Sequence, residues 1–134
     1  KVKYITIMLD DEHPKVYGLD KVDLSKTVYV VEGPFDSTFI DNGIAMCGAD
    51  VSLDSLGIKD LVYVYDNEPR NKEICTRIKK VIDKNHKLVI FPTRILEKDI
   101  NDMVLAGHNV QSMLESNTYQ ALRATIKFNE WKKL

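Results

Sequence analysis

Two stretches of sequence decide the fold: VYVVEGPFD at residues 28–36 and LVYVYDNE at residues 61–68. Each begins as a short run of β-branched and aromatic residues, which is typical of a buried strand, and each run ends on a carboxylate. In a parallel sheet, neighbouring strands deliver their carboxyl ends to one edge, where ligands of open α/β sheets bind. We therefore expect Glu32, Asp66 and Glu68 to gather around one point.

These three acids predict a cation site. Like charges that converge repel one another unless a cation lies among them, and sites made of carboxylates alone favour Mg²⁺ or Mn²⁺. Asp66 and Glu68 are one residue apart, so in an extended segment their side chains leave the same face. The alternative for Asp66 alone is a helix cap or a solvated loop charge. Asp36 is expected to cap the short helix that follows it.

Size and composition indicate one soluble globular domain. The chain has 134 residues, of which 44% are hydrophobic and 29% charged, and its formal net charge is −1. A near-neutral chain has no global basic field, so any contact with nucleic acid must come from a local patch. Cys47 and Cys75 do not form a metal-binding pair by spacing and are predicted to be reduced thiols, as in a cytoplasmic protein. No apolar run approaches a membrane span. Because the chain begins at Lys1 without a methionine, we expect it to be a piece of a longer polypeptide.

The order of the predicted elements favours an α/β fold with a mostly parallel, four-stranded central sheet flanked by helices, plus an extra N-terminal strand. Residues 16–19 are expected to pack beside the next strand, and residues 119–134 show a mixed pattern. Strands are predicted at residues 3–9, 28–32, 44–47, 61–65 and 87–91, and helices at 36–40, 52–56, 69–84, 99–106 and 110–116.

A second charged segment, EKDIND at residues 97–102, follows the last predicted strand and falls at the same sheet edge. It makes Lys98 available to a phosphate, and Arg70 could act in the same way, although a solvated charge run is the usual explanation of such a segment. The basic residues between Arg77 and Lys87 form either a solubility face or a track for a nucleic-acid backbone. The histidines and Trp131 carry no spacing that indicates chemistry.

These motifs resemble a Toprim domain, the metal-binding catalytic fold shared by DnaG-type primases, topoisomerases and the OLD-type and RecR-type proteins. The resemblance rests on a strand that ends in Glu-Gly, an acid three residues beyond the glycine, and a later strand that ends in acid-x-acid. Here these stand as VVEGPFD at residues 30–36 and YDNE at residues 65–68. The sequences VEGPFDS at residues 31–37 and DNEPRNK at residues 66–72 are similar to segments of the primases of T-even-type bacteriophages. This similarity extends the match from about residues 26–107 to nearly the whole chain.

The resemblance implies a single Toprim catalytic domain over residues 1–134, with a core at about 26–107, a lead-in at 1–25 and a C-terminal extension at 108–134. It implies that Glu32, Asp66 and Glu68 are the catalytic and metal-binding acids, with Mg²⁺ or Mn²⁺ as the cofactor. Gly33, Arg70, Lys98 and Asp99 would bind substrate, and Asp102 would be a further metal contact. This chain has Asp66-x-Glu68 where cellular members have Asp-x-Asp, so the metal-binding carboxylate reaches one methylene further.

The activity that the resemblance implies is primer synthesis by a phage DNA primase, a nucleotidyl transfer that uses a single-stranded DNA template, NTPs and a replicative helicase partner in the host cytoplasm. The zinc module and basic subdomain that primases place upstream are not in this sequence, so primer synthesis is expected to need further domains. Two alternatives stay open: a Toprim nuclease that cleaves a phosphodiester with the same metals, and an inactive metal- or DNA-binding module that docks partners. A topoisomerase, whose catalytic tyrosine lies in another domain, is also not excluded.

Overall fold

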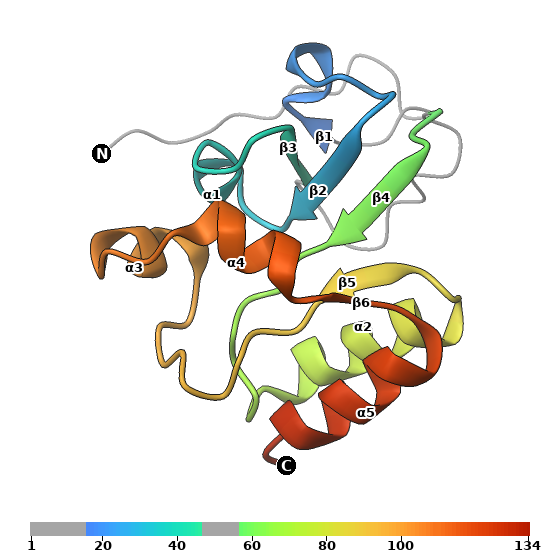
Figure 1. Ribbon diagram of the computed structural model, residues 1–134, viewed down its shortest axis with the longest axis vertical. Helices are drawn as coiled ribbons and strands as arrows, with labels where there is room; N and C mark the ends of the chain where they lie inside the picture. Colours follow the sequence, from blue (N-terminus) through green and yellow to red (C-terminus); the bar gives the residue numbers. More distant parts are fainter. Residues whose placement is uncertain (1–15, 47–56) are drawn as a thin grey trace.

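The computed structural model describes residues 16–46 and 57–134, and these form a six-stranded sheet in the order β1-β3-β2-β4-β5-β6 (Figure 1). The central four strands, β3, β2, β4 and β5, pair in parallel, whereas β1 and β6 pair antiparallel at the two edges. The predicted α/β fold with a parallel four-stranded centre is therefore confirmed, and it is consistent with a Toprim-like fold. The strand bounds are β1 Val16–Tyr17, β2 Thr27–Val31, β3 Gly43–Met46, β4 Asp60–Tyr63, β5 Lys87–Val89 and β6 Thr118–Tyr119.

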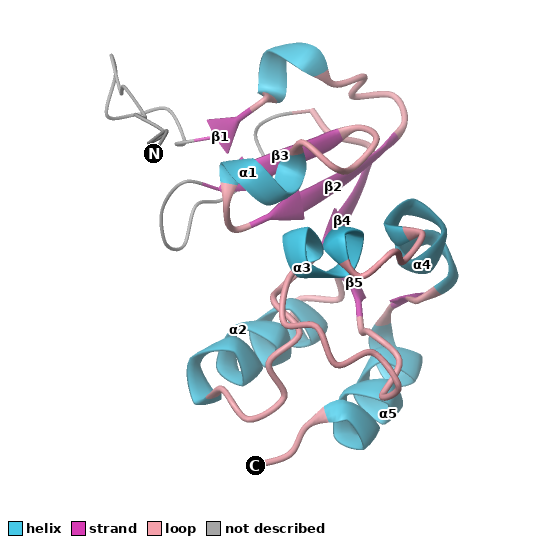
Figure 2. Ribbon diagram, turned by 90° about the vertical axis from the view of Figure 1, so that its left-hand side faces the viewer, coloured by secondary structure: helices cyan, strands magenta, loops and turns pink. Residues whose placement is uncertain are grey.

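Helices cover both faces of the sheet, because the central strands are apolar on both sides. Tyr29 and Val31 of β2 pack with residues of α3 and α4, whereas Leu88 of β5 packs with α2 and α5 on the other side. Figure 2 shows α1 and α3 in front of the strands and α2 and α5 side by side below them. The helix bounds are α1 Pro34–Ser37, α2 Lys72–Asp83, α3 Ile100–Leu105, α4 Val110–Ser116 and α5 Ala121–Trp131, with a 3₁₀ turn at Leu19–Lys21.

The apolar stripe predicted for the longest helix is confirmed in α2, where Ile74, Ile78 and Val81 are buried. The helix begins at Lys72, later than predicted, because Asn71 is its N-cap and accepts a hydrogen bond from the Ile74 N–H at 3.1 Å. Asn85, with a φ of 61°, lies in the left-handed region just after the helix end. Residues 69–71 therefore belong to the loop that carries Asp66 and Glu68, and not to the helix.

Residues 119–134, whose mixed pattern predicted no element, contain the end of β6 and the whole of α5. The buried stripe of α5 is Ala124, Phe128 and Trp131, at the spacing of a helix. Leu122 and Ile126 lie exposed on another face of the same helix, at 71% and 50%. Apolar residues on two faces hide the helical period from a reading of the sequence alone.

Residues 16 and 17 were predicted to pack beside the next strand, and their side chains do pack against clusters that contain residues of β2. Their backbone, however, pairs antiparallel with β3 and not with β2. The reason is that both sides of β2 are taken by the parallel partners β3 and β4. The strand predicted at 3–9, the helix predicted at 52–56 and Cys47 lie outside the described residues. Cys75 is a buried free thiol on α2. In the part of the chain that the structure describes, no helix combines the length and the apolar character needed to cross a membrane.

Candidate active site

The two strands that lead to the predicted acids are direct neighbours. Strands β2 and β4 pair in parallel with Val30 opposite Tyr63, and the Val64 N–H donates to the Val30 carbonyl oxygen at 2.8 Å beyond the printed end of β4. Glu32 follows β2 by one residue and Asp66 follows β4 by three. The parallel pairing therefore delivers the segments that carry both carboxylates to the same edge of the sheet.

Asp66 lies at the electrostatic centre of this edge. Its own burial is the main cause that raises the pKa of Asp66 to about 7, and the negative charges of Glu32, Asp36, Asp99 and Glu68 raise it further, in that order. A carboxyl group with a pKa near 7 is unusual for a residue that is not fully buried, and perturbed groups of this kind gather at functional sites.

Asp36 belongs to the same group of charges. Burial raises the pKa of Asp36, the charges of Asp99 and Asp102 raise it further, and a hydrogen bond from the Asn101 N–H opposes them. The N-cap of α1 is Gly33, so the prediction that Asp36 caps the helix that follows it is wrong. Asp36 instead reaches across to the first turn of α3 and accepts the Asn101 N–H at 3.2 Å. The acids thus come from the ends of β2 and β4, from α1 and from the start of α3.

Each neighbour of Asp66 accepts a hydrogen bond from the protein. As the side chains stand, no group of three or more His, Cys, Asp or Glu residues among residues 16–46 and 57–134 is arranged to hold a metal ion. The carboxylates are turned to protein donors instead: Glu32 to Arg77 at 2.6 Å, Glu68 to Asn71 Nδ2 at 3.1 Å, Asp36 to the Asn101 N–H, and Asp99 to the Asp102 N–H at 2.8 Å. A cation at this edge would therefore require one or more of these carboxylates to turn.

The loop after β4 is held by Asn67, a residue to which the sequence analysis assigned no role. Asn67 is 7% exposed, and its Nδ2 donates to the carbonyl oxygens of Ile95 at 2.9 Å and Glu97 at 3.0 Å. Its Oδ1 accepts the indole N–H of Trp131 at 2.7 Å, and its N–H donates to the Lys98 carbonyl oxygen at 2.7 Å. Every polar group of this side chain is bonded, so Asn67 ties the acid loop to the segment before α3 and to α5.

The loop is not the extended segment that was predicted. The chain bends at Asn67, and the Glu68 N–H donates to the Asp66 carbonyl oxygen at 2.9 Å. This tight turn lies between the two acids, and Glu68 is the weakest of the four charges that act on Asp66. The C-terminal segment adds a further tie, because the Lys133 N–H donates to the Pro69 carbonyl oxygen at 2.9 Å.

Arg77 is the cation that faces the acids, and the sequence placed it only in a basic stretch. It projects from α2, and its Nη1 contacts Glu32 Oε2 at 2.6 Å. Its Nη2 contacts Glu73 Oε1 at 2.6 Å, one helical turn earlier. The Arg77 and Glu32 side chains are 28% and 33% exposed, so the pair is only partly shielded from water. Helical spacing links Arg77 to Glu73, whereas only the fold brings Arg77 to Glu32.

The residues predicted to bind substrate surround this edge, but no contact in the structure tests that role. Gly33 precedes α1, and a Cβ built on it would meet nothing within 4 Å, so the space beside its backbone is open. Arg70 and Lys98 are exposed. Asp99 is the N-cap of α3 and Asp102 lies in the first turn of that helix.

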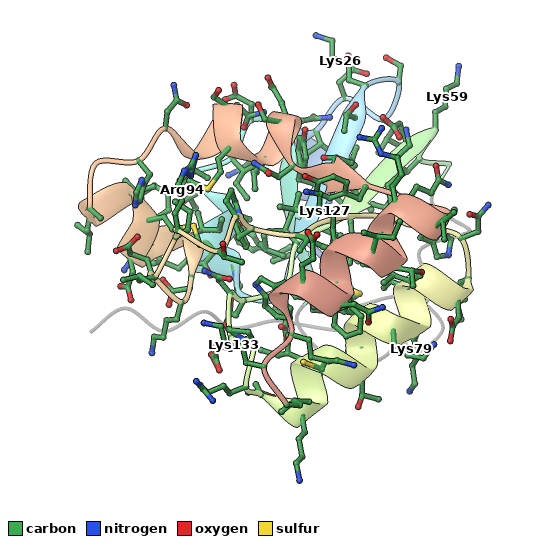
Figure 3. The ribbon with its side chains drawn as sticks, turned by 60° about the horizontal axis from the view of Figure 1, so that its bottom comes forward. Lys26, Lys59, Lys79, Arg94, Lys127 and Lys133 are labelled. Atoms are coloured by element: carbon green, nitrogen blue, oxygen red, sulfur yellow. The ribbon has the colours of Figure 1, made fainter. Side chains whose placement is uncertain are left out.

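The remaining basic residues do not form one continuous track. Lys79 pairs with Asp83 at 3.2 Å and Lys87 pairs with Asp60 at 2.9 Å, whereas Lys80 and Lys84 are exposed. Figure 3 shows further cations on α5 and on the segment that follows it, Lys127 and Lys133, in the same helical layer as Lys79.

A separate hollow of about 460 Å³ lies between the segment after β5 and α4. Its lining includes Arg94, Ser112 and His108, and the His108 Nε2 lies 2.7 Å from Glu97 Oε1. This hollow does not contain the acids, so it is a distinct feature of the surface.

The donor set of the acidic edge fits a hard divalent cation. Its oxygens are carboxylates from Glu32, Asp36, Asp66, Glu68 and Asp99, which are the ligands that Mg²⁺ and Mn²⁺ prefer. Within the described ranges 16–46 and 57–134, Arg77 is the one cationic side chain that bonds to any of these carboxylates, and it bonds to Glu32. A bound cation would offset the surplus negative charge that raises the pKa of Asp66.

Comparison with known proteins relates the chain to part of a phage DNA primase. No family model matches it. The DNA primase of Enterobacteria phage T4 is 35% identical over 98% of this chain, and the chain spans about 40% of the length of that relative. Identity at this level over nearly the entire chain shows common descent with that part of the phage protein. We conclude that the chain is a primase-related region, homologous over almost its whole length to part of a phage DNA primase.

Proposed function

We propose that this region is the Toprim-type catalytic domain of a phage DNA primase, and that Glu32, Asp66 and Glu68 organise Mg²⁺- or Mn²⁺-dependent nucleotidyl transfer in primer synthesis. The observation that carries the proposal is the edge formed by β2 and β4, where burial, and after it the charges of four other acids, raise the pKa of Asp66 to about 7. The similarity to a phage DNA primase supplies the reaction class. The template would be single-stranded DNA, the substrates NTPs and a further partner a replicative helicase.

A bound divalent cation would favour ionisation of the 3′-hydroxyl of the primer and would offset negative charge on the transferring phosphate. Asp66 would hold it from the rigid loop after β4, in its ionised form. Glu32 would turn from Arg77 toward it, and Glu68 would be the third carboxylate of the site. The open backbone at Gly33 leaves room for a nucleotide phosphate beside these acids. Lys98 and Arg70, both exposed, would contact that phosphate. Asp99 would be a further contact to the substrate and Asp102 a further contact to the metal.

A manganese titration tests the site on the 134-residue chain itself. Paramagnetic broadening of the NMR signals should begin at residues around Glu32, Asp66 and Glu68, and Asp66→Asn should weaken it. Asp41→Asn, which removes an exposed carboxylate outside the group, is the matched control. Broadening that centres on His86 or His108 would contradict the proposed ligands.

The reaction is tested with the complete polypeptide in which this region occurs. We expect templated dinucleotide formation from NTPs on single-stranded DNA, dependent on Mg²⁺ or Mn²⁺. DNA cleavage in place of synthesis would show that the region belongs to a nuclease. Metal and DNA binding with neither reaction would indicate a docking module.

A further inference from the structure

We propose that Arg77 is an exchangeable counter-ion of the acidic edge: it holds Glu32 when no metal is bound, and passes to a phosphate of the incoming nucleotide when a divalent cation takes Glu32. The inference rests on the proposed function and assigns a role to a residue outside the three acids. It identifies the ligand of the freed guanidinium as a phosphate, because Arg matches the geometry of phosphate oxygens as well as that of carboxylates.

The contact between Arg77 and Glu32 is close but not shielded. Nη1 lies 2.6 Å from Glu32 Oε2, and roughly a third of the Glu32 side chain is exposed, at 33%. An ion pair in such a position contributes little to stability, since water solvates both partners when they separate. A divalent cation can therefore displace the guanidinium from Glu32 at small cost.

The second contact of Arg77 keeps the guanidinium near the site after that exchange. Nη2 lies 2.6 Å from Glu73 Oε1 on the same helix, at the i, i+4 spacing. Glu73 is 73% exposed and is not among the acids that act on Asp66, so a metal at Asp66 does not compete for it. Arg77 would stay tethered at Glu73 with its other nitrogen turned to the open space around Gly33.

Arg77 is also the cation that the structure places on these acids. It contacts one of the four carboxylates that raise the pKa of Asp66, and the other three accept hydrogen bonds from Asn71, Asn101 and Asp102, whose donor groups are uncharged. A metal ion bound to Glu32 neutralises part of the negative charge that attracts Arg77. The nucleotide phosphates that bind with the metal bring new negative charge to this edge, and Arg77 can pair with it.

The test is a double-mutant cycle on Mn²⁺ affinity, measured by electron paramagnetic resonance of free Mn²⁺ with the 134-residue chain. Arg77→Gln should tighten Mn²⁺ binding by about three- to tenfold, because a competing ion pair of this kind is worth on the order of 1 kcal/mol. Lys80→Gln, which removes the same charge from an exposed position of α2, should change the affinity less than about twofold. In the Glu32→Gln background the effect of Arg77→Gln should disappear.

The second arm measures nucleotide affinity in saturating Mn²⁺, with GTP as the probe. Arg77→Gln should weaken GTP binding by about tenfold and Arg77→Lys by less, whereas both should leave nucleoside affinity unchanged. An equal gain of Mn²⁺ affinity in Lys80→Gln, or one that persists without Glu32, would overturn the exchange and leave the metal site intact. Unchanged GTP affinity would overturn the phosphate role. Failure of the unmodified chain to bind Mn²⁺ would overturn both the exchange and the proposed function.

Discussion

Glu32 at the end of β2 is held by a half-exposed ion pair, whereas the loop that carries Asp66 and Glu68 after β4 is held by buried hydrogen bonds. An exposed ion pair contributes about 1 kcal/mol or less to stability, so Glu32 can change partner. A buried amide left without its partners costs roughly 1–3 kcal/mol for each group, so the Asp66 loop resists movement. The difference suggests a division of roles in which the β4 loop supplies a fixed carboxylate and β2 supplies an adjustable one.

The largest effect is expected when the adjustable carboxylate is removed. Glu32→Gln in the complete polypeptide should lower templated dinucleotide synthesis by about a hundredfold or more, because charge beside the reacting oxygen matters most in the transition state. DNA affinity and much of the metal affinity should remain, because Asp66 stays in its loop. Glu130→Gln, which removes an exposed carboxylate at the end of α5, is the matched control. Near-normal turnover of Glu32→Gln would show that Glu32 is not a catalytic acid.

The next effect concerns the fixed loop. Asn67→Ala should lower the free energy of unfolding by about 2–4 kcal/mol, because it leaves two carbonyl oxygens and the Trp131 indole without their partner in a buried place. Trp131→Phe, which removes one of those bonds and keeps most of the apolar bulk, should cost about 1–2 kcal/mol. Urea unfolding measures both, and Asn129→Ala on the exposed side of α5 is the control. Additive losses in the double variant would mean that Asn67 and Trp131 do not act through their shared bond.

A smaller effect of opposite sign is expected at Asp66. The folded-state pKa is raised from 3.8 to about 7, so the folded state binds a proton that the unfolded state has lost, and ionisation of Asp66 destabilises the fold as pH rises through this range. Asp66→Asn removes that penalty. In metal-free buffer at pH 8 it should raise the free energy of unfolding by about 1–3 kcal/mol, a range discounted for partial solvent screening.

The same linkage gives the pH dependence. The advantage of Asp66→Asn should be fully present above pH 7 and shrink as the pH falls toward 3.8, below which the carboxyl is protonated in both states. Thermal melts from pH 4 to pH 8 with EDTA measure it, with Asp41→Asn as the control. A lower midpoint for Asp66→Asn at pH 8 would mean that Asp66 acts as a structural cap. Metal affinity of the unmodified chain should weaken below pH 7, because protons then compete for Asp66.

The smallest effect is expected at the ion pair itself. Arg77→Gln should change the free energy of unfolding by about 1 kcal/mol or less, and the difference should shrink further in 1 M NaCl. Urea unfolding of this variant and of Asn67→Ala gives a direct comparison of the ion pair at Glu32 with the buried hydrogen bonds of the Asp66 loop. A loss at Arg77 as large as that at Asn67 would remove the distinction between an adjustable and a fixed carboxylate.

The prediction from sequence succeeded where a local pattern carries the information. The β-branched and aromatic runs predicted the parallel centre of the sheet, and the apolar stripe of α2 was visible as helical spacing. It failed where a helix carries apolar residues on more than one face, as in α5. It also failed where the hydrogen-bond partner of a side chain lies far away in the sequence. Asp36 was read as the cap of its own helix because it stands beside that helix, yet its partner is Asn101, 65 residues away.

The amino-acid sequence alone was enough to predict that the runs at 28–32 and 61–65 are strands of one parallel sheet and that acids follow both, because strand propensity is a local property. It could not reveal how those acids are held. The Arg77–Glu32 pair spans 45 residues and the Trp131–Asn67 bond spans 64. Contacts of that kind depend on how helices pack on the two faces of the sheet, and no spacing in the sequence encodes a direction of approach from a distant helix.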